Sequence, residues 1–496
     1  MKKIIAYTLL LGAALGLSAC FGIDEENYPE LSPIELTVPS DIINANLGEK
    51  IVYQGLEVKS DLPVTYEWSY GSPRKGTQIT DHQFTGEILT ISDSPTIDYT
   101  FTRIGSYILR LKIDNGESIL YKFFTLNVNS GYDEGIAVLC NDDAGQGSLA
   151  FIKTLSEEEQ AAGVRQVYAD IFSAINPDYS LKNATALYMS NQTVSKVDYN
   201  GVLIGTADEP GTLYHLEAKT FEMYAVNKVK EQFGVTCQAF GGEYAASGGF
   251  GSFFLGSDGA VYRYDMQFGN LTRMDDIPQN VEHLLATNNR TNANSASLLD
   301  PLFFNEESII FRKSSYNGVK TSSEPGYRII NVGIRRTATP GPIYVLLQSR
   351  EDPTSYKIMW QNLTFTAAGW QEVTSFTTDH LTMDYGAKTV NTKNSNEVYY
   401  VYENAIYRWP LTTAPASVPS ITLPDGEIIR DIAANRKGKE KGLEDEDLLL
   451  VATCNPSRSG HKGSVYVYRF SDHSLAASYE GICDDPVAIM YKYRIN

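Results

Sequence analysis

The amino-acid sequence predicts an all-β protein with at least two domains. The chain contains 32 tyrosines and 39 glycines, and its apolar residues fall in short alternating runs rather than in long helical repeats. Such alternation is typical of strands that bury one face. With 496 residues, the chain also exceeds one ordinary hydrophobic core, so we expect more than one domain.

The first residues have the pattern of an export signal. Lys2 and Lys3 give a positive start, and residues 4–19 form an apolar run that is too short to cross a bilayer as a stable helix. Residues 1–19 are therefore predicted to be a signal peptide that is absent from the mature protein.

The end of this segment, LSAC at 17–20, resembles the lipobox of bacterial lipoproteins. That resemblance implies that the thiol of Cys20 is acylated and that residues 20–32 form a lipidated linker. The acids at 24–26 resemble the flank that sends lipoproteins of Bacteroidota to the outer face of the outer membrane. The alternative is an ordinary secretory peptide with an incidental cysteine.

Composition limits the other partners of the chain. Apolar residues make up 43%, and no second apolar stretch is long enough to span a bilayer, so only the lipid is expected to touch the membrane. The formal charge is −19, and it becomes −21 when Lys2 and Lys3 are removed. This charge repels phosphate backbones, so nucleic acid is not expected as a partner.

The first domain is predicted to cover residues 33–129. The stretches PVTYEWSY (63–70) and YTFTRIGSYILRLKIDNG (99–116) alternate as strands buried on one face do. Together they resemble the paired signatures of the PKD domain, which implies an immunoglobulin-like β-sandwich. The Gly-Asp-Gly of that family is missing after the tryptophan strand, which leaves a divergent fold of the same class open. Trp68 is interpreted as a core residue.

Two segments of the chain fit helices better than strands. Residues 156–174 begin with several acids, as the first turn of a helix often does, and a shorter helical pattern covers 221–233. Both are expected to be insertions between strands.

An internal repeat marks the second domain, predicted to cover residues 130–496. SDGAVYRYD (257–265) aligns without gaps to YENAIYRWP (402–410), and GSVYVYRF (463–470) is a looser third copy. In the first two copies an Asp-Gly or Glu-Asn dipeptide supplies the positive φ angles of a tight turn, so each copy is predicted to be a β-hairpin.

Related hairpins are predicted at 135–154, 186–201 and 343–360, with a poorly marked copy at 308–331. Their spacing gives roughly six intervals of about fifty residues, close to the period of kelch-type repeats. This period favours a β-propeller of seven blades, with six or eight as alternatives. A β-sandwich with similar hairpins is the other interpretation.

The end of the sequence predicts how the ring closes. PVAIMYKY (486–493) resembles the start of another repeat, as IIRDIAAN (428–435) precedes LLLVATC (448–454), and the hairpin at 135–154 lacks a first strand. The C-terminal strand is therefore expected to complete the first blade.

The search for catalytic and cofactor motifs is negative. There is no His-Glu-x-x-His, Gly-x-Ser-x-Gly, phosphate-binding glycine loop or Cys-x-x-Cys pair, and the six histidines are scattered. NDDAGQG (141–147) has oxygen ligands of the kind that hold calcium, but it fits the EF-hand spacing poorly and is interpreted as a turn. No metal or cofactor site is predicted.

As a whole, the chain resembles the PKD-like surface lipoproteins of Bacteroidota, which accompany Sus-type nutrient uptake systems. The resemblance implies an outer-membrane, lipid-anchored protein that faces the cell exterior. It also implies a role in binding a glycan or peptide, or in scaffolding an uptake complex with a TonB-dependent transporter and a companion surface lipoprotein. The alternative is a propeller-fold polysaccharide lyase or glycoside hydrolase, which needs paired carboxylates or a His/Tyr base in the channel.

Two extended loops are predicted to share one rim of the ring. They are CNDDAGQG (140–147) and CNPSRSGHKG (454–463), which become neighbours when the ring closes. The residues predicted to line a polar ligand site there are Asp142, Asp143, Asn455, Arg458 and His461. Two ordinary surface loops are the alternative.

Four cysteines remain besides Cys20, in a compartment that permits disulfides. The ring closure predicts that Cys140 and Cys483 approach each other, with Cys454–Cys483 as the rival pair. Four free, buried thiols are the alternative to either bridge.

Overall fold

The computed structural model describes residues 31–46, 50–74, 79–101, 103–129, 131–161, 163, 165–194, 197–246, 249–285, 302–312, 319–335, 342–362, 370–390, 396–435 and 448–493. The chain forms two compact units, Met1–Ser130 (unit 1) and Gly131–Asn496 (unit 2). The predicted signal peptide, Cys20 and all but the last two residues of the linker lie outside the described residues. In the described ranges, no helix has the length and apolar character that crossing a bilayer requires.

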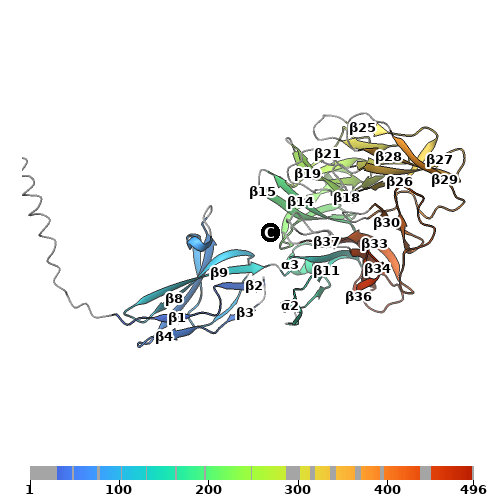
Figure 1. Cartoon of the computed structure of the whole chain (residues 1–496). Helices are drawn as coiled ribbons and strands as arrows, with labels where there is room; N and C mark the ends of the chain where they lie inside the picture. The colour runs from blue at the N-terminus through green and yellow to red at the C-terminus, as the bar shows by residue number, and fades with distance from the viewer. Residues whose placement is uncertain are drawn as a thin grey trace, which may run out of the picture. The chain divides into compact units, whose positions relative to one another are not determined.

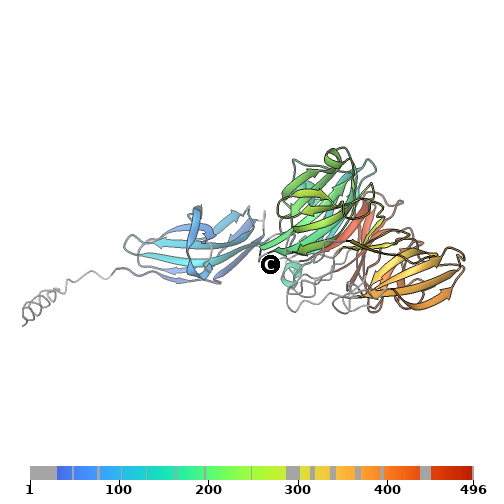
Figure 2. The same ribbon diagram turned by 90° about the horizontal axis from the view of Figure 1, so that it is seen from above.

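Unit 1 contains one five-stranded sheet and two small sheets, drawn in blue in Figures 1 and 2. The large sheet has the order β2-β9-β8-β5-β6, and its pairs are antiparallel except for the parallel pair β2-β9. Its strands are β2 (Ile42–Asn46), β5 (Thr65–Pro73), β6 (Phe84–Ser92), β8 (Gly105–Asp114) and β9 (Ile119–Asn129). The small sheets pair β1 (Glu35–Thr37) with β4 (Glu57–Lys59), and β3 (Lys50–Tyr53) with β7 (Ile97–Thr100); a short 3-10 helix, η2 (Ile79–Asp81), precedes β6.

The core of unit 1 forms between the large sheet and the small sheets. Leu109 and Leu111 alternate along β8 and are fully buried, as their spacing in the sequence predicts. Trp68 is also fully buried, and its indole N–H donates a hydrogen bond to the Ser94 carbonyl at 3.1 Å. The interpretation of Trp68 as a core residue is therefore confirmed.

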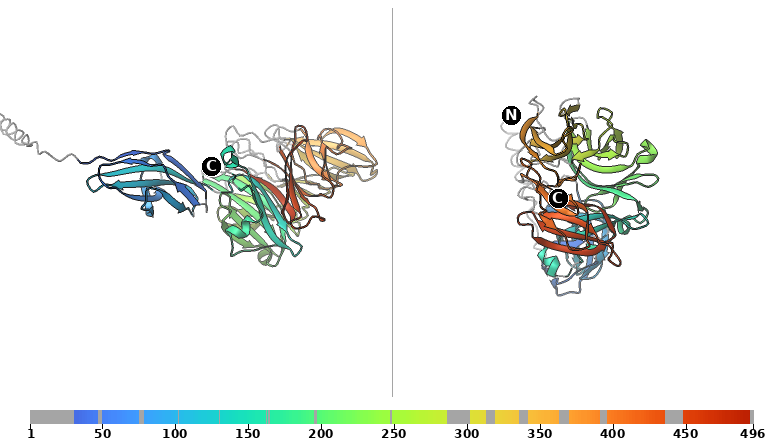
Figure 3. Two further views of the ribbon diagram at one scale, coloured as in Figure 1. Left: turned by 90° about the horizontal axis from the view of Figure 1, so that it is seen from below. Right: turned by 90° about the vertical axis from the view of Figure 1, so that its right-hand side faces the viewer.

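Unit 2 is a β-propeller, and its described residues form seven antiparallel sheets that follow one another in chain order (Figure 3). The first sheet contains β10 (Gly135–Asn141), β11 (Gln146–Lys153), β12 (Val167–Tyr168), β13 (Leu181–Lys182) and β37 (Asp485–Lys492). The second contains β14 (Ala184–Val194), β15 (Val197–Thr206), β16 (Thr212–Glu217) and β17 (Met223–Lys228). The third contains β18 (Cys237–Ala246), β19 (Gly249–Gly256), β20 (Val261–Asp265) and β21 (Asn270–Arg273).

Of the remaining four sheets, the sixth has three described strands and the others have four. The fourth contains β22 (His283–Leu285), β23 (Leu302–Phe304), β24 (Ile309–Arg312) and β25 (Val319–Ser322). The fifth contains β26 (Tyr327–Ile334), β27 (Pro342–Ser349), β28 (Ser355–Asn362) and β29 (Gln371–Thr377). The sixth contains β30 (Val398–Tyr402), β31 (Ala405–Trp409) and β32 (Ile421–Thr422), and the seventh contains β33 (Ile428–Ala434), β34 (Leu448–Cys454), β35 (Gly463–Arg469) and β36 (Leu475–Cys483).

The C-terminal strand closes the ring in the predicted way. β37 pairs antiparallel with β10, from Gly135 opposite Lys492 to Asn141 opposite Asp485. It also packs against β14 of the second sheet and β33 of the seventh, so the first and last sheets become neighbours. Figure 1 shows β37 between β14 and β33.

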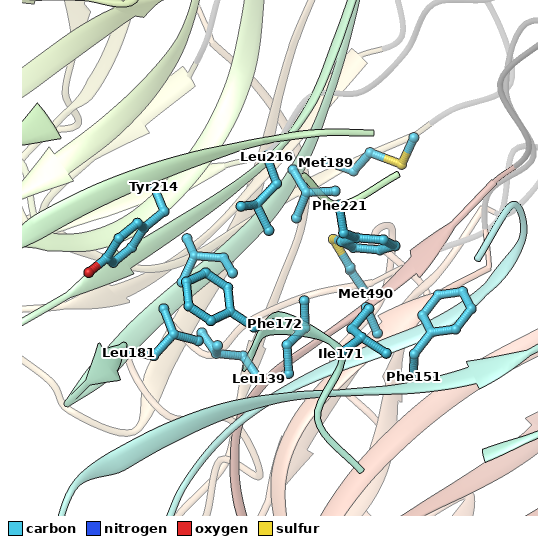
Figure 4. Packing of buried hydrophobic residues seen from close by; sticks show 14 of the residues in the cluster. Leu139, Phe151, Ile171, Phe172, Leu181, Met189, Tyr214, Leu216, Phe221 and Met490 are labelled. Atoms are coloured by element: carbon cyan, nitrogen blue, oxygen red, sulfur yellow. The ribbon is translucent and has the colours of Figure 1, made fainter. Parts of the chain in front are cut away.

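The apolar layer between the first two sheets includes the closing strand. Figure 4 shows Met490 of β37 packed with side chains from both sheets and from the short helix α3 (Ile171–Ile175). Closure of the ring and burial of this layer are therefore linked.

Two sequence-based helix predictions are wrong in extent. Residues 156–174 form α2 (Glu157–Ala161) and α3, separated by β12, which pairs with β11. In the other segment only α4 (Val229–Phe233) is helical, because the residues before it pair with β16 as strand β17. Sheet hydrogen bonds thus override local helical preference in both segments.

The poorly marked copy does contain a hairpin, because β24 pairs antiparallel with β25, although these are the third and fourth strands of their sheet. Residues 308–331 were expected to form one copy, but they hold the last two strands of the fourth sheet and the beginning of β26 in the fifth. The strands of the fourth sheet have only three or four residues each, so they carry little periodicity.

Candidate functional site

A cavity of about 450 Å³ lies among the innermost strands of unit 2. Each of the seven sheets contributes residues to the lining of this cavity. The sixth sheet contributes Val398 of β30 and the chain segment before that strand. One lining residue from each sheet in turn is Ile489, Leu187, Phe240, His283, Asn331, Thr389 and Ala433. The volume falls within the range of small-molecule binding pockets, and the lining mixes apolar side chains with polar and charged ones.

One polar group of the lining lies at the start of the fourth sheet. Glu282 is exposed, and its carboxylate accepts a hydrogen bond from the hydroxyl of Tyr385. Burial, together with this hydrogen bond to Glu282, raises the pKa of Tyr385 well above its usual range. Tyr385 is therefore a neutral phenol at physiological pH.

His283 lies next to this pair. Its ring stacks on Phe304, with ring centroids 4.8 Å apart, and meets Tyr385 edge-on at 4.7 Å. Burial lowers the pKa of His283, so the imidazole is mostly uncharged at neutral pH. Gly386 has φ +66°, and a Cβ there would lie 2.0 Å from the ring of His283, so only glycine fits this position without a shift.

A second polar pair links three innermost segments. Lys388 donates to Asp431 of β33 at 2.7 Å, and the other carboxylate oxygen of Asp431 accepts from the backbone N–H of Ile489 in β37 at 2.9 Å. Asp431 is the more buried partner, with 11% of its side chain exposed against 56% for Lys388. The only cation that lines the cavity in the described ranges is thus paired with a carboxylate.

Aromatic rings form another part of the wall. Tyr188 of β14 and Phe240 of β18 lie with their rings 30° from parallel and 6.5 Å apart. Such rings offer a large apolar surface at low entropic cost to a bound ligand.

The sequence-predicted loop site lies elsewhere on the propeller. Its two loops do meet, because Lys462 forms an ion pair with Asp143 at 2.8 Å. Asp142 holds a turn, since its carboxylate accepts from the N–H groups of Ala144 and Gln146. This agrees with the interpretation of 141–147 as a turn, and none of the predicted residues lines the cavity.

The other predicted residues are engaged with their neighbours. Arg458 donates to Glu427 and Glu480, both at 2.9 Å, and the Asn455 amide donates to Glu427 at 3.3 Å. His461 lies 3.0 Å from the carboxylate of Asp484. The contacts of Arg458 and Asn455 lie within the seventh sheet and its loops, and that of His461 reaches the residue before β37. Ligand binding by these residues stays a prediction.

The cysteines of unit 2 are free thiols. Cys140, Cys237, Cys454 and Cys483 are all buried and unbonded, so the structure contains the free-thiol alternative and neither predicted bridge. It nevertheless places Cys140 and Cys483 in the same buried apolar cluster at the ring closure. Burial raises the pKa of the Cys140 thiol well above its usual value, which makes this thiol unreactive at neutral pH.

Metal-binding geometry is absent from the described parts of the chain. No group of three or more His, Cys, Asp or Glu side chains there is placed to hold an ion. The site that the structure offers is therefore the cavity, whose polar residues the sequence interpretation missed. One signal was available, because Asp431 is a charged residue within a segment already identified as a first strand.

Comparison with known proteins adds limited information. No protein-family model and no curated protein matches the chain. Similar solved structures include a quinoprotein alcohol dehydrogenase-like protein from Bacteroides thetaiotaomicron, with TM-score 0.44 and 14% identity over 94% of this chain and 100% of that one. A DUF4784 family protein from Bacteroides caccae has TM-score 0.32 and 9% identity, covering 93% and 99%. A β-propeller domain from Myceliophteria thermophila has TM-score 0.35 and 12% identity, covering 60% and 86%.

Proposed function

We propose that this protein is a lipid-anchored surface protein that binds a nutrient ligand, a peptide or glycan, in the central cavity of its propeller. Unit 1 is the PKD/Ig-like stalk, and the seven sheets are the blades of one ring. The observation that carries the proposal is the cavity itself, because all seven sheets line it and its wall combines apolar and aromatic surface with a few polar groups.

The polar groups favour binding over catalysis. A glycosidase needs two carboxyl groups that face each other across the substrate, one of them free to act as base or nucleophile. Glu282 instead accepts from Tyr385, and Asp431 is held by Lys388 and by a backbone N–H. A phenol whose pKa is raised is a poor general base at neutral pH. We further propose that the bound ligand is handed to a TonB-dependent transporter, with a companion surface lipoprotein as partner.

Filling the cavity is expected to weaken ligand binding strongly. Thr389 lines the cavity and is half-buried, so Thr389→Trp places a large ring in the ligand volume. We expect a peptide or glycan that raises the Tm of the wild type to lose at least about tenfold in affinity. Thr422→Trp, at an exposed position of the same sheet, is the matched control. Equal affinity in all three proteins would place the ligand outside the cavity.

The lipid anchor is tested at Cys20. Wild-type protein is expected to incorporate labelled fatty acid, to sediment with membranes and to be cleaved by protease added to intact cells. Cys20→Ala is expected to lose the label and the membrane association, whereas Cys237→Ala, which removes a buried thiol of unit 2, is expected to keep both. Absence of label from the wild type would reject lipidation, and protease resistance on intact cells would reject only the surface location.

A further inference from the structure

The charges that line the cavity do not cancel. In the described ranges the charged lining residues are Glu282, Lys388 and Asp431. Lys388 and Asp431 neutralise each other at 2.7 Å, whereas no lysine or arginine of these ranges lies within 4 Å of the Glu282 carboxylate. Nearby Glu306 is paired with Arg328 at 3.5 Å. Among the residues that the structure describes, the wall therefore carries one accessible negative charge without a counter-ion.

Aromatic rings surround this carboxylate. Tyr385 donates to it, and His283 follows it in the chain. Phe304 is the cross-strand partner of His283 in β23, and its ring centroid lies 6.4 Å from that of Tyr385. The ring face of a tyrosine is the negative end of its quadrupole and attracts cations, so Tyr385 can contribute here, whereas Phe304 is buried and stacked on His283. The imidazole adds little positive charge, because burial keeps it mostly neutral.

From this arrangement we infer that the cavity binds a ligand through a primary ammonium group, with Glu282 as its counter-ion and the neighbouring rings as its packing surface. The inference rests on the proposed function and narrows its ligand to an amine, such as a peptide N-terminus, a lysine side chain or an amino sugar. The formal charge of −19 adds a long-range attraction for such cations. An uncharged glycan would supply no counter-ion for Glu282.

The test compares two probes of equal shape and different charge. Phenethylamine carries an ammonium group, and 2-phenylethanol carries a hydroxyl in its place. We expect the wild type to bind phenethylamine at least about fivefold more tightly than 2-phenylethanol, because an exposed ion pair and a cation–π contact both favour the amine. Calorimetry or ligand-observed NMR measures the two affinities. Glu282→Gln keeps an acceptor for the Tyr385 hydroxyl and is expected to remove most of this preference.

Two controls separate the charge effect from the site. Glu351→Gln removes an exposed carboxylate from a loop of the fifth sheet outside the cavity and is expected to keep the preference. Glu282→Asp keeps the charge and is expected to retain part of it. Thr389→Trp is expected to block both probes.

The outcomes distinguish the two proposals. Equal affinity for both probes, blocked by Thr389→Trp, would overturn the ammonium inference and leave the cavity as the binding site. If both probes bind Thr389→Trp with unchanged affinity, the proposal that the cavity is the binding site would be overturned. Two further probe pairs then identify the source of the amine: trialanine against N-acetylated trialanine, and glucosamine against glucose. For a peptide ligand, acetylation of trialanine is expected to lower its affinity.

Discussion

Deletion of residues 485–496 is expected to leave unit 2 without a cooperative unfolding transition. The deletion removes β37, which supplies the innermost strand of the first sheet and joins the first and last sheets. It also removes Ile489 and Met490 from two apolar layers, and the fully buried Lys492, whose ammonium group donates to the Asp133 carbonyl at 2.6 Å. Burying each such apolar side chain stabilises by about 1.5–3 kcal/mol. For these two side chains the loss is about 3–6 kcal/mol, which by itself reaches the lower end of the stability of a whole domain, about 5–15 kcal/mol.

Scanning calorimetry and near-UV circular dichroism measure this effect. A chain that ends at Tyr493 is the control, because it keeps every residue of β37. Adding a synthetic peptide of residues 485–496 to the truncated protein is expected to restore part of the near-UV signal, as the strand can pair again with β10. A truncated protein with the wild-type melting profile would show that β37 does not hold the ring closed.

Trp68→Ala is expected to unfold unit 1 and to leave unit 2 folded. The indole is fully buried, packs against Tyr53 and Phe124 with ring centroids 5.9 and 5.4 Å away, and donates to the Ser94 carbonyl. Replacing a buried tryptophan by alanine costs about 3–5 kcal/mol through lost burial and the cavity that remains. That loss is a large part of the stability of a domain of this size.

The measurement is urea unfolding of the full chain, monitored with a separate signal from each unit. Trp68→Phe keeps most of the apolar contact and loses the indole N–H, so its expected cost is smaller, about 1–2 kcal/mol. A cost for Trp68→Ala that does not exceed that of Trp68→Phe would mean that the site collapses around the missing ring and that the core does not depend on its volume.

The fold could be predicted where local chemistry decides it. Glu403 and Asn404 both have positive φ, at 43° and 62°, so the dipeptide read from the repeat is the turn between β30 and β31. The short helices show the limit of this reasoning. The acids at 157–159 do start a helix, since Ser156 and Glu159 cap each other, but the helix α2 ends at Ala161, and Gly163 follows with φ +67°. The chain then forms strand β12 instead of continuing the helix, because β12 pairs with β11.

The cavity could not be predicted because its residues meet only in the folded ring. Glu282 and Tyr385 are 103 positions apart, and Lys388 and Asp431 are 43 apart. Neither pair forms a motif in the sequence. The loop prediction did bring together two segments that touch through Asp143 and Lys462, 319 positions apart, because ring closure fixes their proximity. It could not show that neighbouring carboxylates already hold Arg458.

The pairing of β37 with β10 has a consequence for how the protein is made. Residue 135 is synthesised long before its partner at 492, so the first sheet keeps an open edge while every later sheet of unit 2 emerges. An unpaired strand edge is a template for wrong association. Such distant pairing also gives a high contact order, which slows folding. Completion of the propeller is therefore expected to follow synthesis rather than accompany it, with the newly made chain depending on chaperones to shield that edge until its last strand arrives.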